Sequence, residues 1–234
     1  MDIRGAVVLV TGANRGLGRA WTRMLLEAGA AKVYACARDP SNMFHPGAVP
    51  LELDITRPEQ VERAARTCGD TNIIINNAGI VRGGPLFSGG ATQRLQQELE
   101  TNLFGTLAMC EAFAPVLGAN GGGAIVNVLS VLSWISIPGA ETYAMSKAAT
   151  WALTNGVRNA LRAQGTQVLG LHVAFMDTDM TAGIEAPKAL PEDVVRQAML
   201  ALEAGREEVL ADLPARQVKH GLSLDPGIYL QPPA

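Results

Sequence analysis

The chain has 234 residues, 48% of them hydrophobic and only 5% aromatic, and its formal net charge at pH 7 is −3. This length and apolar content allow one large α/β domain, or two small ones, with a sizeable buried core. The sequence has no basic block, which argues against a nucleic-acid partner, and no uninterrupted apolar run approaches the ~18–20 residues of a membrane-spanning helix.

Short β-branched runs alternate with helical patterns along the chain. The predicted strands are Ala6–Thr11, Lys32–Ala37, Val49–Leu53, Asn72–Asn76, Ala124–Leu129, Val168–Ala174 and Glu208–Ala211. The predicted helices are Arg19–Ala28, Pro58–Thr67, Thr92–Leu117, Thr142–Gln164 and Pro191–Ala204. This alternation predicts an α/β fold: a Rossmann-like, doubly wound parallel sheet of about seven strands with helices on both faces, in three α/β/α layers. We expect residues 1–234 to form a single domain, with a small loop region around residues 175–190.

The turn after the first strand is rich in glycine. Thr11 is followed by GANRGLG and then by a helical pattern. Glycines let the backbone approach a ligand closely, and the start of a helix favours an anion. The spacing G-x-x-x-G-x-G differs from the general dinucleotide fingerprint, and no G-K-[ST] of a P-loop follows. A glycine-capped turn is the alternative, but the order of strand, turn and helix favours a dinucleotide site.

Two arginines favour NADP(H) over NAD(H). An acid near the end of the second strand would bind the ribose 2′-hydroxyl, whereas an arginine accommodates a 2′-phosphate. The strand tip is Ala37, the next residue is Arg38, and Arg15 of the glycine loop could reach the same phosphate. Asp39 is the acid that would favour NAD(H), the less expected cofactor. The alternative for both arginines is a pair of solvated surface cations.

Tyr143 and Lys147 lie one turn apart on a predicted helix, and therefore on one face. Carbonyl reduction requires a proton donor whose pKa lies near the working pH, and a free tyrosine, at ~10, is too weak an acid. The lysine charge would lower the tyrosine pKa, so Tyr143 is expected to act as general acid and base. Ser130 could stabilise the charge on the carbonyl oxygen. Taken alone, the pair could equally be a surface pair.

The glycine loop, the sequence NNAG at Asn76–Gly79 and the pair Tyr143-x-x-x-Lys147 follow one another in order. With these motifs the chain resembles the short-chain dehydrogenase/reductase family, in its compact branch with a single NAD(P)-binding Rossmann-fold domain. The resemblance implies a catalytic tetrad of Asn102, Ser130, Tyr143 and Lys147. It further implies that Lys147 binds the nicotinamide ribose and that Asn102 supports a water chain that resupplies the proton.

The resemblance and the residue chemistry together suggest a larger site. Residues expected to bind the cofactor are Gly12, Asn14, Arg15, Gly16, Leu17, Gly18, Arg38, Asp54, Ile55, Asn77, Ala78, Gly79, Tyr143, Lys147, Phe175, Met176 and Thr178. Residues expected to contact the substrate are Ser130, Leu132, Trp134, Ile137, Tyr143, Phe175 and Ile184. These loops carry few charges, so we expect a small hydrophobic ketone or aldehyde and its alcohol as substrate. The alternative is that several of these side chains belong to the core.

Two stretches depart from the family pattern. Val173 and Ala174 stand where the family usually has Pro-Gly, and the segment Thr181–Lys188 is short, which predicts a small substrate lid. His45, His172 and His220 are scattered without the spacing of metal ligands, so we read them as structural or surface residues and expect no metal.

These patterns predict an NADP(H)-dependent oxidoreductase. The alternatives are an NAD-dependent alcohol dehydrogenase that works oxidatively, a non-catalytic NADP(H)-binding regulator, and an interaction protein that uses the fold as a scaffold. Surplus apolar residues on Thr142–Gln164 and the family resemblance make a homodimer or homotetramer plausible. The three cysteines without a C-x-x-C, and an N-terminus without an apolar signal region, predict a cytoplasmic protein.

Overall fold

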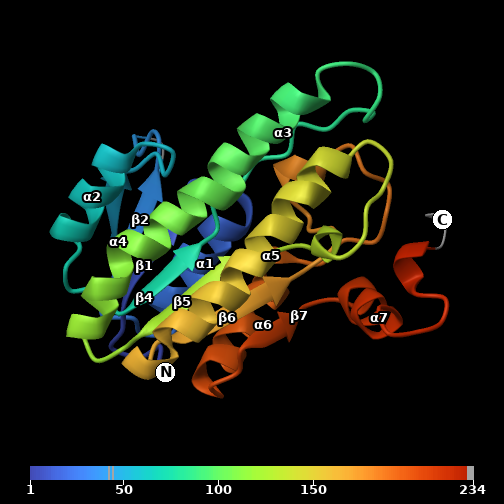
Figure 1. Cartoon of the computed structure of the whole chain (residues 1–234). Helices are drawn as coiled ribbons and strands as arrows, with labels where there is room; N and C mark the ends of the chain where they lie inside the picture. Colours follow the sequence, from blue (N-terminus) through green and yellow to red (C-terminus); the bar gives the residue numbers. More distant parts are fainter. Residues whose placement is uncertain (42, 44, 231–234) are drawn as a thin grey trace.

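A seven-stranded parallel sheet forms the middle layer of the protein (Figure 1). The computed structural model describes residues 1–41, 43 and 45–230. The strands are β1 (Val7–Thr11), β2 (Lys32–Ala37), β3 (Ala48–Glu52), β4 (Ile73–Asn76), β5 (Ala124–Val128), β6 (Gln167–His172) and β7 (Glu208–Leu210). Their order, β3-β2-β1-β4-β5-β6-β7, reverses its direction of winding between β1 and β4. The predicted doubly wound sheet is therefore confirmed, and β1 and β4 flank its topological switch point.

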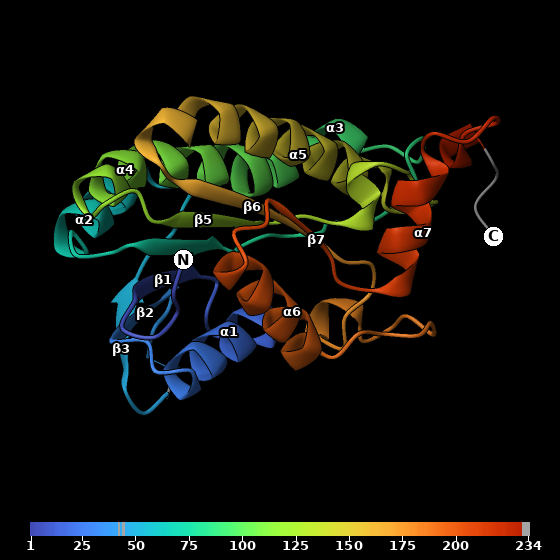
Figure 2. The same ribbon diagram turned by 90° about the horizontal axis from the view of Figure 1, so that it is seen from below.

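Helices cover both faces of the sheet (Figure 2). α1 (Gly16–Glu27) and α6 (Pro191–Glu203) lie on one face, while α2 (Pro58–Thr67), α4 (Thr106–Ala119) and α5 (Glu141–Leu161) lie on the other. The side chains of β1 point alternately to the two faces of the sheet. Val8 and Val10 belong to the same apolar cluster as Trp21 of α1, whereas Leu9 belongs to the cluster of Phe113 of α4. Burial on both faces explains why these strands are continuous apolar runs rather than alternating ones.

The predicted helix Thr92–Leu117 is interrupted by a wider turn. It consists of α3 (Ala91–Leu99), a π-helical segment (Glu100–Gly105) and α4. The whole span Ala91–Ala119 is long and apolar enough, by length and composition, to cross a membrane, although polar residues interrupt its apolar runs. Met109, Phe113 and Leu117 are nevertheless fully buried against the sheet. We therefore assign this helix to the core of the protein.

The sequence analysis missed one helix, α7 (Leu213–Gly221), which lies beside the carboxyl end of β7. Asp212 caps it, because its Oδ1 atom accepts the N–H of Ala215 at 2.8 Å. The residues Asp212-Leu-Pro are a recognisable helix start, with a capping acid followed by a proline. The other carboxylate oxygen of Asp212 accepts the N–H of Ala174 at 2.7 Å. Ala174 therefore lies outside β6, which ends at His172 rather than at the predicted Ala174.

Gly18 offers a direct test of the packing between α1 and the turn that precedes it. A Cβ atom at Gly18 would overlap the carbonyl oxygen of Gly12 and lie 2.6 Å from Asn77 Nδ2. Since the backbone must shift to admit it, we expect Gly18→Ala to lower the free energy of unfolding by about 1–3 kcal/mol.

The matched control is Gly156→Ala. Gly156 lies inside α5 with open space around it, so the same change should raise the free energy of unfolding by about 0.5–1 kcal/mol. Equilibrium urea unfolding measures both effects. Equal stabilities for the two variants would contradict the packing described here.

Candidate active site

One cavity of about 1130 Å³ opens beside the switch point, at the carboxyl ends of the strands. Ligands of doubly wound folds bind at this place. Every residue predicted to bind the cofactor lines the cavity except Gly18, which packs behind it. Of the residues predicted to contact substrate, Trp134 is the exception. Sequence reasoning did not select Gln96, Gln97 and Met180, which also line the cavity; they lie outside any recognised motif.

The glycine loop forms a narrow cradle against the end of β4. Gly12 has a φ of +64°, and a Cβ atom there would lie 3.0 Å from the Cα of Ala78. Asn77 Nδ2 donates to the carbonyl oxygens of Thr11 and Gly12 at 2.9 and 3.1 Å. In the described chain no side chain caps the first turn of α1, whose residues Gly16 and Leu17 line the cavity. Free helix N–H groups beside a glycine turn fit the pyrophosphate of a dinucleotide.

Lys147 is the most deeply buried charged group of the cavity wall. Its side chain is 5% exposed, and its Nζ atom donates to the carbonyl oxygen of Val128 at 2.8 Å. Burial lowers the pKa of the ammonium from 10.5 to about 8, because a charged form loses hydration in the interior. Lys147 therefore titrates close to neutral pH.

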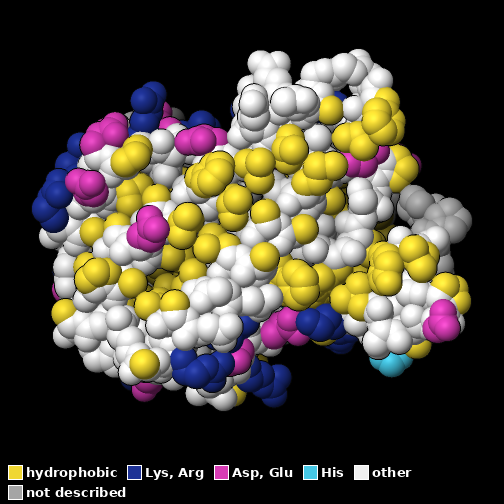
Figure 3. Space-filling view, in the orientation of Figure 1, with side chains coloured by type: hydrophobic (Ala, Val, Ile, Leu, Met, Phe, Trp, Pro, Cys, Tyr) yellow, Lys and Arg dark blue, Asp and Glu magenta, His cyan; other side chains and the backbone are white. Residues whose placement is uncertain are grey.

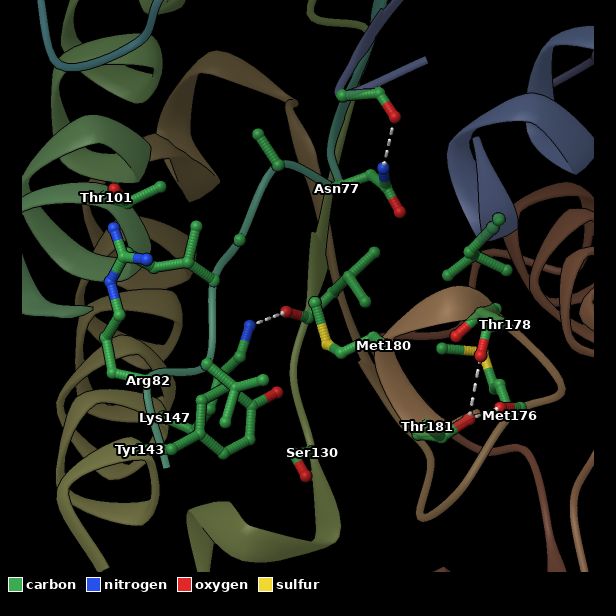
Figure 4. Close-up of a pocket in the computed structure, with 18 of the residues that line it drawn as sticks. Asn77, Arg82, Thr101, Ser130, Tyr143, Lys147, Met176, Thr178, Met180 and Thr181 are labelled. Atoms are coloured by element: carbon green, nitrogen blue, oxygen red, sulfur yellow. Dashed lines mark hydrogen bonds between the residues drawn. The ribbon is translucent and has the colours of Figure 1, made fainter. Parts of the chain in front are cut away.

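Tyr143 lies between Lys147 and Ser130 on one side of the cavity (Figure 4). Burial raises the pKa of its phenol, the neighbouring Ser130 hydroxyl lowers it in part, and the charge of Glu98 raises it further. Lys147 Nζ lies 5.7 Å from the centre of the Tyr143 ring. From the sequence, Lys147 is expected to lower the pKa of Tyr143. In the structure this pKa is raised instead, because the loss of hydration of the phenolate is the largest effect. Tyr143 consequently holds its proton at neutral pH, and its pKa lies further from the working pH than the sequence alone predicts.

Asn102 lies in the π-helical segment, 1% exposed and behind the cavity wall. Its Oδ1 atom accepts the N–H of Ile80 at 2.8 Å, and its Nδ2 atom donates to Ile80 O and Ser146 Oγ, both at 2.9 Å. A Cβ atom on Gly79 would lie 3.2 Å from Asn102 Oδ1 and 3.7 Å from Lys147 Nζ. Glycine at this position therefore keeps open the space between the two groups, where the predicted water chain would run.

Ser130 follows β5 and caps a short 3-10 turn, Val131–Ser133. Its Oγ atom accepts the N–H of Leu132 at 3.1 Å, which orients the hydroxyl. Trp134, predicted to contact substrate, instead stacks on the imidazole of His172, with ring centres 3.9 Å apart. Trp134 thus supports the wall of the cavity and is not part of its surface.

The predicted loop region around residues 175–190 closes on itself. Ala189 N–H donates to Phe175 O at 2.8 Å, and Asp177 N–H donates to Ala189 O at 3.0 Å. Phe175, Met176, Thr178 and Ile184 all line the cavity from this loop. In place of the family's Pro-Gly, Val173 O accepts the N–H of Val131 at 3.0 Å and Ala174 is held by Asp212. Two hydrogen bonds therefore hold the backbone of Val173 and Ala174, the residues that depart from the family pattern.

Comparison with known proteins agrees with this site. The family model of the short chain dehydrogenases matches residues 6–189. The chain therefore belongs to the short chain dehydrogenase family, and it is an oxidoreductase of that family with a site for a nicotinamide cofactor.

Individual relatives show how far the likeness extends. A short chain dehydrogenase of Burkholderia cenocepacia J2315, solved in complex with NADP, is 39% identical and superposes with a TM-score of 0.94 over 99% of this chain and 100% of that one. The 3-oxoacyl-[acyl-carrier-protein] reductase FabG of Vibrio harveyi is 30% identical over 220 residues, 88% of this chain and 85% of that protein. Farnesol dehydrogenase of Aedes aegypti is 28% identical in an alignment of 243 residues, gaps included, which covers 95% of this chain and 96% of that protein.

The buried ammonium of Lys147 predicts a particular dependence of stability on pH. The fall of its pKa from 10.5 to about 8 on folding corresponds to about 3 kcal/mol of lost stability when the amine is charged. We therefore expect Lys147→Met to raise the free energy of unfolding at pH 7 by up to about 3 kcal/mol.

The sign follows from proton binding. Between pH 8 and 10.5 the folded protein has released the proton that the unfolded chain still holds, so the stability of the wild type rises with pH in this interval. The difference in free energy of unfolding between Lys147→Met and the wild type should be largest below pH 8 and should vanish as the pH approaches 10.5. Urea unfolding at a series of pH values measures it. A gap that does not change with pH would contradict the burial of a charged lysine.

Proposed function

We propose that the protein is an NADP(H)-dependent carbonyl reductase that interconverts a hydrophobic ketone or aldehyde and its alcohol. The observation that carries this proposal is the group formed by buried Lys147, buried Ser130 and partly buried Tyr143 at the wall of the dinucleotide cavity. Loss of hydration raises the pKa of the Tyr143 phenol, so the phenol carries the proton that carbonyl reduction requires.

A bound nicotinamide would supply the hydride, and the chain's own residues would manage the proton. Ser130 would donate a hydrogen bond to the carbonyl oxygen and stabilise the charge that develops there. Tyr143 would transfer its phenolic proton to that oxygen. Lys147, with a pKa of about 8, would return a proton to the phenolate through water held beside Asn102.

The surroundings of β2 support NADP(H) rather than NAD(H). Arg15 and Arg38 both line the cavity. The Asp39 carboxylate is occupied by its own loop, because it accepts the N–H and the hydroxyl of Ser41 at 2.9 and 2.6 Å. Arg15 lies 3.5 Å from Asp179 in an exposed ion pair, a weak contact that a phosphate could replace. The relative from Burkholderia cenocepacia, which was solved with NADP, is consistent with this preference.

Apolar side chains line part of the cavity, among them Leu132, Ile137, Met180 and Ile184. The polar Gln96 and Gln97 and the charged Arg82 line it as well. This lining supports a hydrophobic carbonyl substrate. The two curated relatives are named for 3-oxoacyl-[acyl-carrier-protein] and for farnesol, so relatives at this level of identity do not share one substrate.

We further propose that the protein forms a homodimer or homotetramer in the cytoplasm. Hydrophobic side chains gather on the outer surface over α4 and α5 (Figure 3). Phe104, in the π-helical segment before α4, and Met145, in α5, are 52% and 44% exposed, and a contiguous exposed apolar patch marks an interaction site. Cys36, Cys68 and Cys110 are buried and free, which agrees with a reducing compartment.

Cofactor preference is tested by titration with NADPH and NADH, followed by nicotinamide fluorescence. We expect NADPH to bind more tightly, and Arg38→Ala to weaken NADPH about tenfold or more while leaving NADH within about twofold, because only NADPH carries the phosphate that the guanidinium meets. Arg66→Ala, the same change on exposed α2, is the matched control. Equal weakening of both cofactors by Arg38→Ala would contradict the assignment.

Catalysis is tested with Tyr143→Phe against a panel of aryl and alkyl ketones and aldehydes. Because the phenol is the proton donor, kcat should fall about 100-fold or more. The dissociation constant of NADPH should stay within about threefold, since the ring is retained. Turnover by the variant at the rate of the wild type, or a wild type that binds NADPH and reduces no carbonyl compound, would favour the regulatory alternative.

A further inference from the structure

His172 is a buried histidine to which neither the cofactor site nor the proton relay assigns a role. It is the last residue of β6, its side chain is fully buried, and it directly precedes Val173-Ala174. Its Nδ1 atom lies 3.2 Å from the backbone carbonyl oxygen of Ser130. Because a carbonyl oxygen can only accept, Nδ1 must carry the hydrogen, and this contact fixes the tautomer of the ring.

The rest of the imidazole is enclosed by groups that do not compete for this tautomer. Trp134 stacks on one face, with an angle of 18° between the rings. The Nε2 atom finds no hydrogen-bond partner in the described part of the chain and lies 3.8 Å from Glu208 Oε1. Burial lowers the pKa of His172 to about 4, so the ring is neutral at physiological pH. A neutral ring with one directed N–H is suited to orientation rather than to proton transfer.

Helix α7 holds this stack from outside. Lys219 Nζ lies 4.8 Å from the centre of the Trp134 ring and 2.8 Å from Glu208 Oε1. Trp134 also meets the edge of Trp151, with ring centres 6.3 Å apart and an angle of 86°. A cation over an aromatic face and an edge-to-face pair are both favourable arrangements. The position of the imidazole is therefore determined by elements far from it in sequence.

We propose that His172 is a positioning residue for Ser130. Its Nδ1–H and the N–H of Ser133, at 3.0 Å, both reach the Ser130 carbonyl oxygen. Together they fix the backbone orientation from which the Ser130 hydroxyl points toward Tyr143. A displacement of an orienting group by about 1 Å can cost a large factor in rate, so the bond acts on kcat rather than on binding. This inference rests on the proposed function for its kinetic part only.

Two substitutions separate the hydrogen bond from the stacking. His172→Phe keeps an aromatic ring against Trp134 and removes the donor. His172→Asn removes the ring and keeps an N–H near the position of Nδ1. His220→Phe, at an exposed histidine of α7, is the matched control. The measurements are kcat and KM for a reduced ketone, the dissociation constant of NADPH, and amide hydrogen exchange of the segment 130–134.

We expect His172→Phe to lower kcat about tenfold with KM and NADPH affinity within about twofold, and to speed exchange in segment 130–134 about tenfold, as the loss of one buried hydrogen bond would. His172→Asn should recover most of both effects, and His220→Phe should match the wild type. Wild-type kcat and wild-type exchange in His172→Phe would overturn the proposal, as would equal defects in the two His172 variants.

Hydrogen exchange also separates this proposal from the proposed function. If the wild type reduced no carbonyl compound, the reductase assignment would fail. Faster exchange in His172→Phe, restored in His172→Asn, would still support the positioning of Ser130 by His172. Unchanged exchange in both variants would overturn it without reference to turnover.

Discussion

The burial of the Lys147 ammonium is the constraint on which the rest of the site depends. A charge that is removed from water must meet polar partners in the interior, and β5 supplies one because Val128, its last residue, presents a carbonyl oxygen to Nζ. α5 must therefore lie deep against the carboxyl end of the sheet. At the same depth Tyr143 is partly buried, and the lost hydration raises the pKa of its phenol. A proton donor and a titratable amine thus arise from one packing arrangement.

Buried hydrogen bonds keep α5 at this depth. Thr150 Oγ1 donates to the carbonyl oxygen of Asn102 at 3.0 Å, and Asn102 in turn donates to Ser146. Further along the helix, Asn127 Nδ2 donates to Thr154 Oγ1 at 3.0 Å, which joins α5 to β5. A buried polar network of this kind is favourable only when every donor and acceptor in it meets its partner, and this requires one relative position of the helices and the strand. It therefore specifies the register between α5 and the π-helical segment, and with it the relative positions of Lys147 and Ile80.

Residues with strong local signals were predictable from the sequence. Continuous apolar runs identified the strands, and the motifs around Gly12, Asn77 and Tyr143 identified the cavity, because these motifs follow strand ends that meet at one edge of a parallel sheet. Features that depend on contacts between distant segments were not predictable. Three such features are the π-helical turn at Asn102, the stacking of Trp134 on His172 outside the cavity lining, and the hydrogen bond from Ala174 to Asp212. The raised pKa of Tyr143 has the same origin, because spacing alone reveals the neighbouring lysine and not the depth of burial.

The most direct test of the central claim is the ionisation of Tyr143 itself. An ultraviolet difference titration of the free protein, wild type against Tyr143→Phe, isolates this phenol from Tyr34 and Tyr229, the other tyrosines of the chain. A phenol whose pKa is raised by lost hydration predicts no Tyr143 signal up to about pH 10, the value of an ordinary tyrosine. A phenolate that appears below about pH 9 in the wild type and not in the variant would contradict the claim, because Lys147 would then outweigh burial.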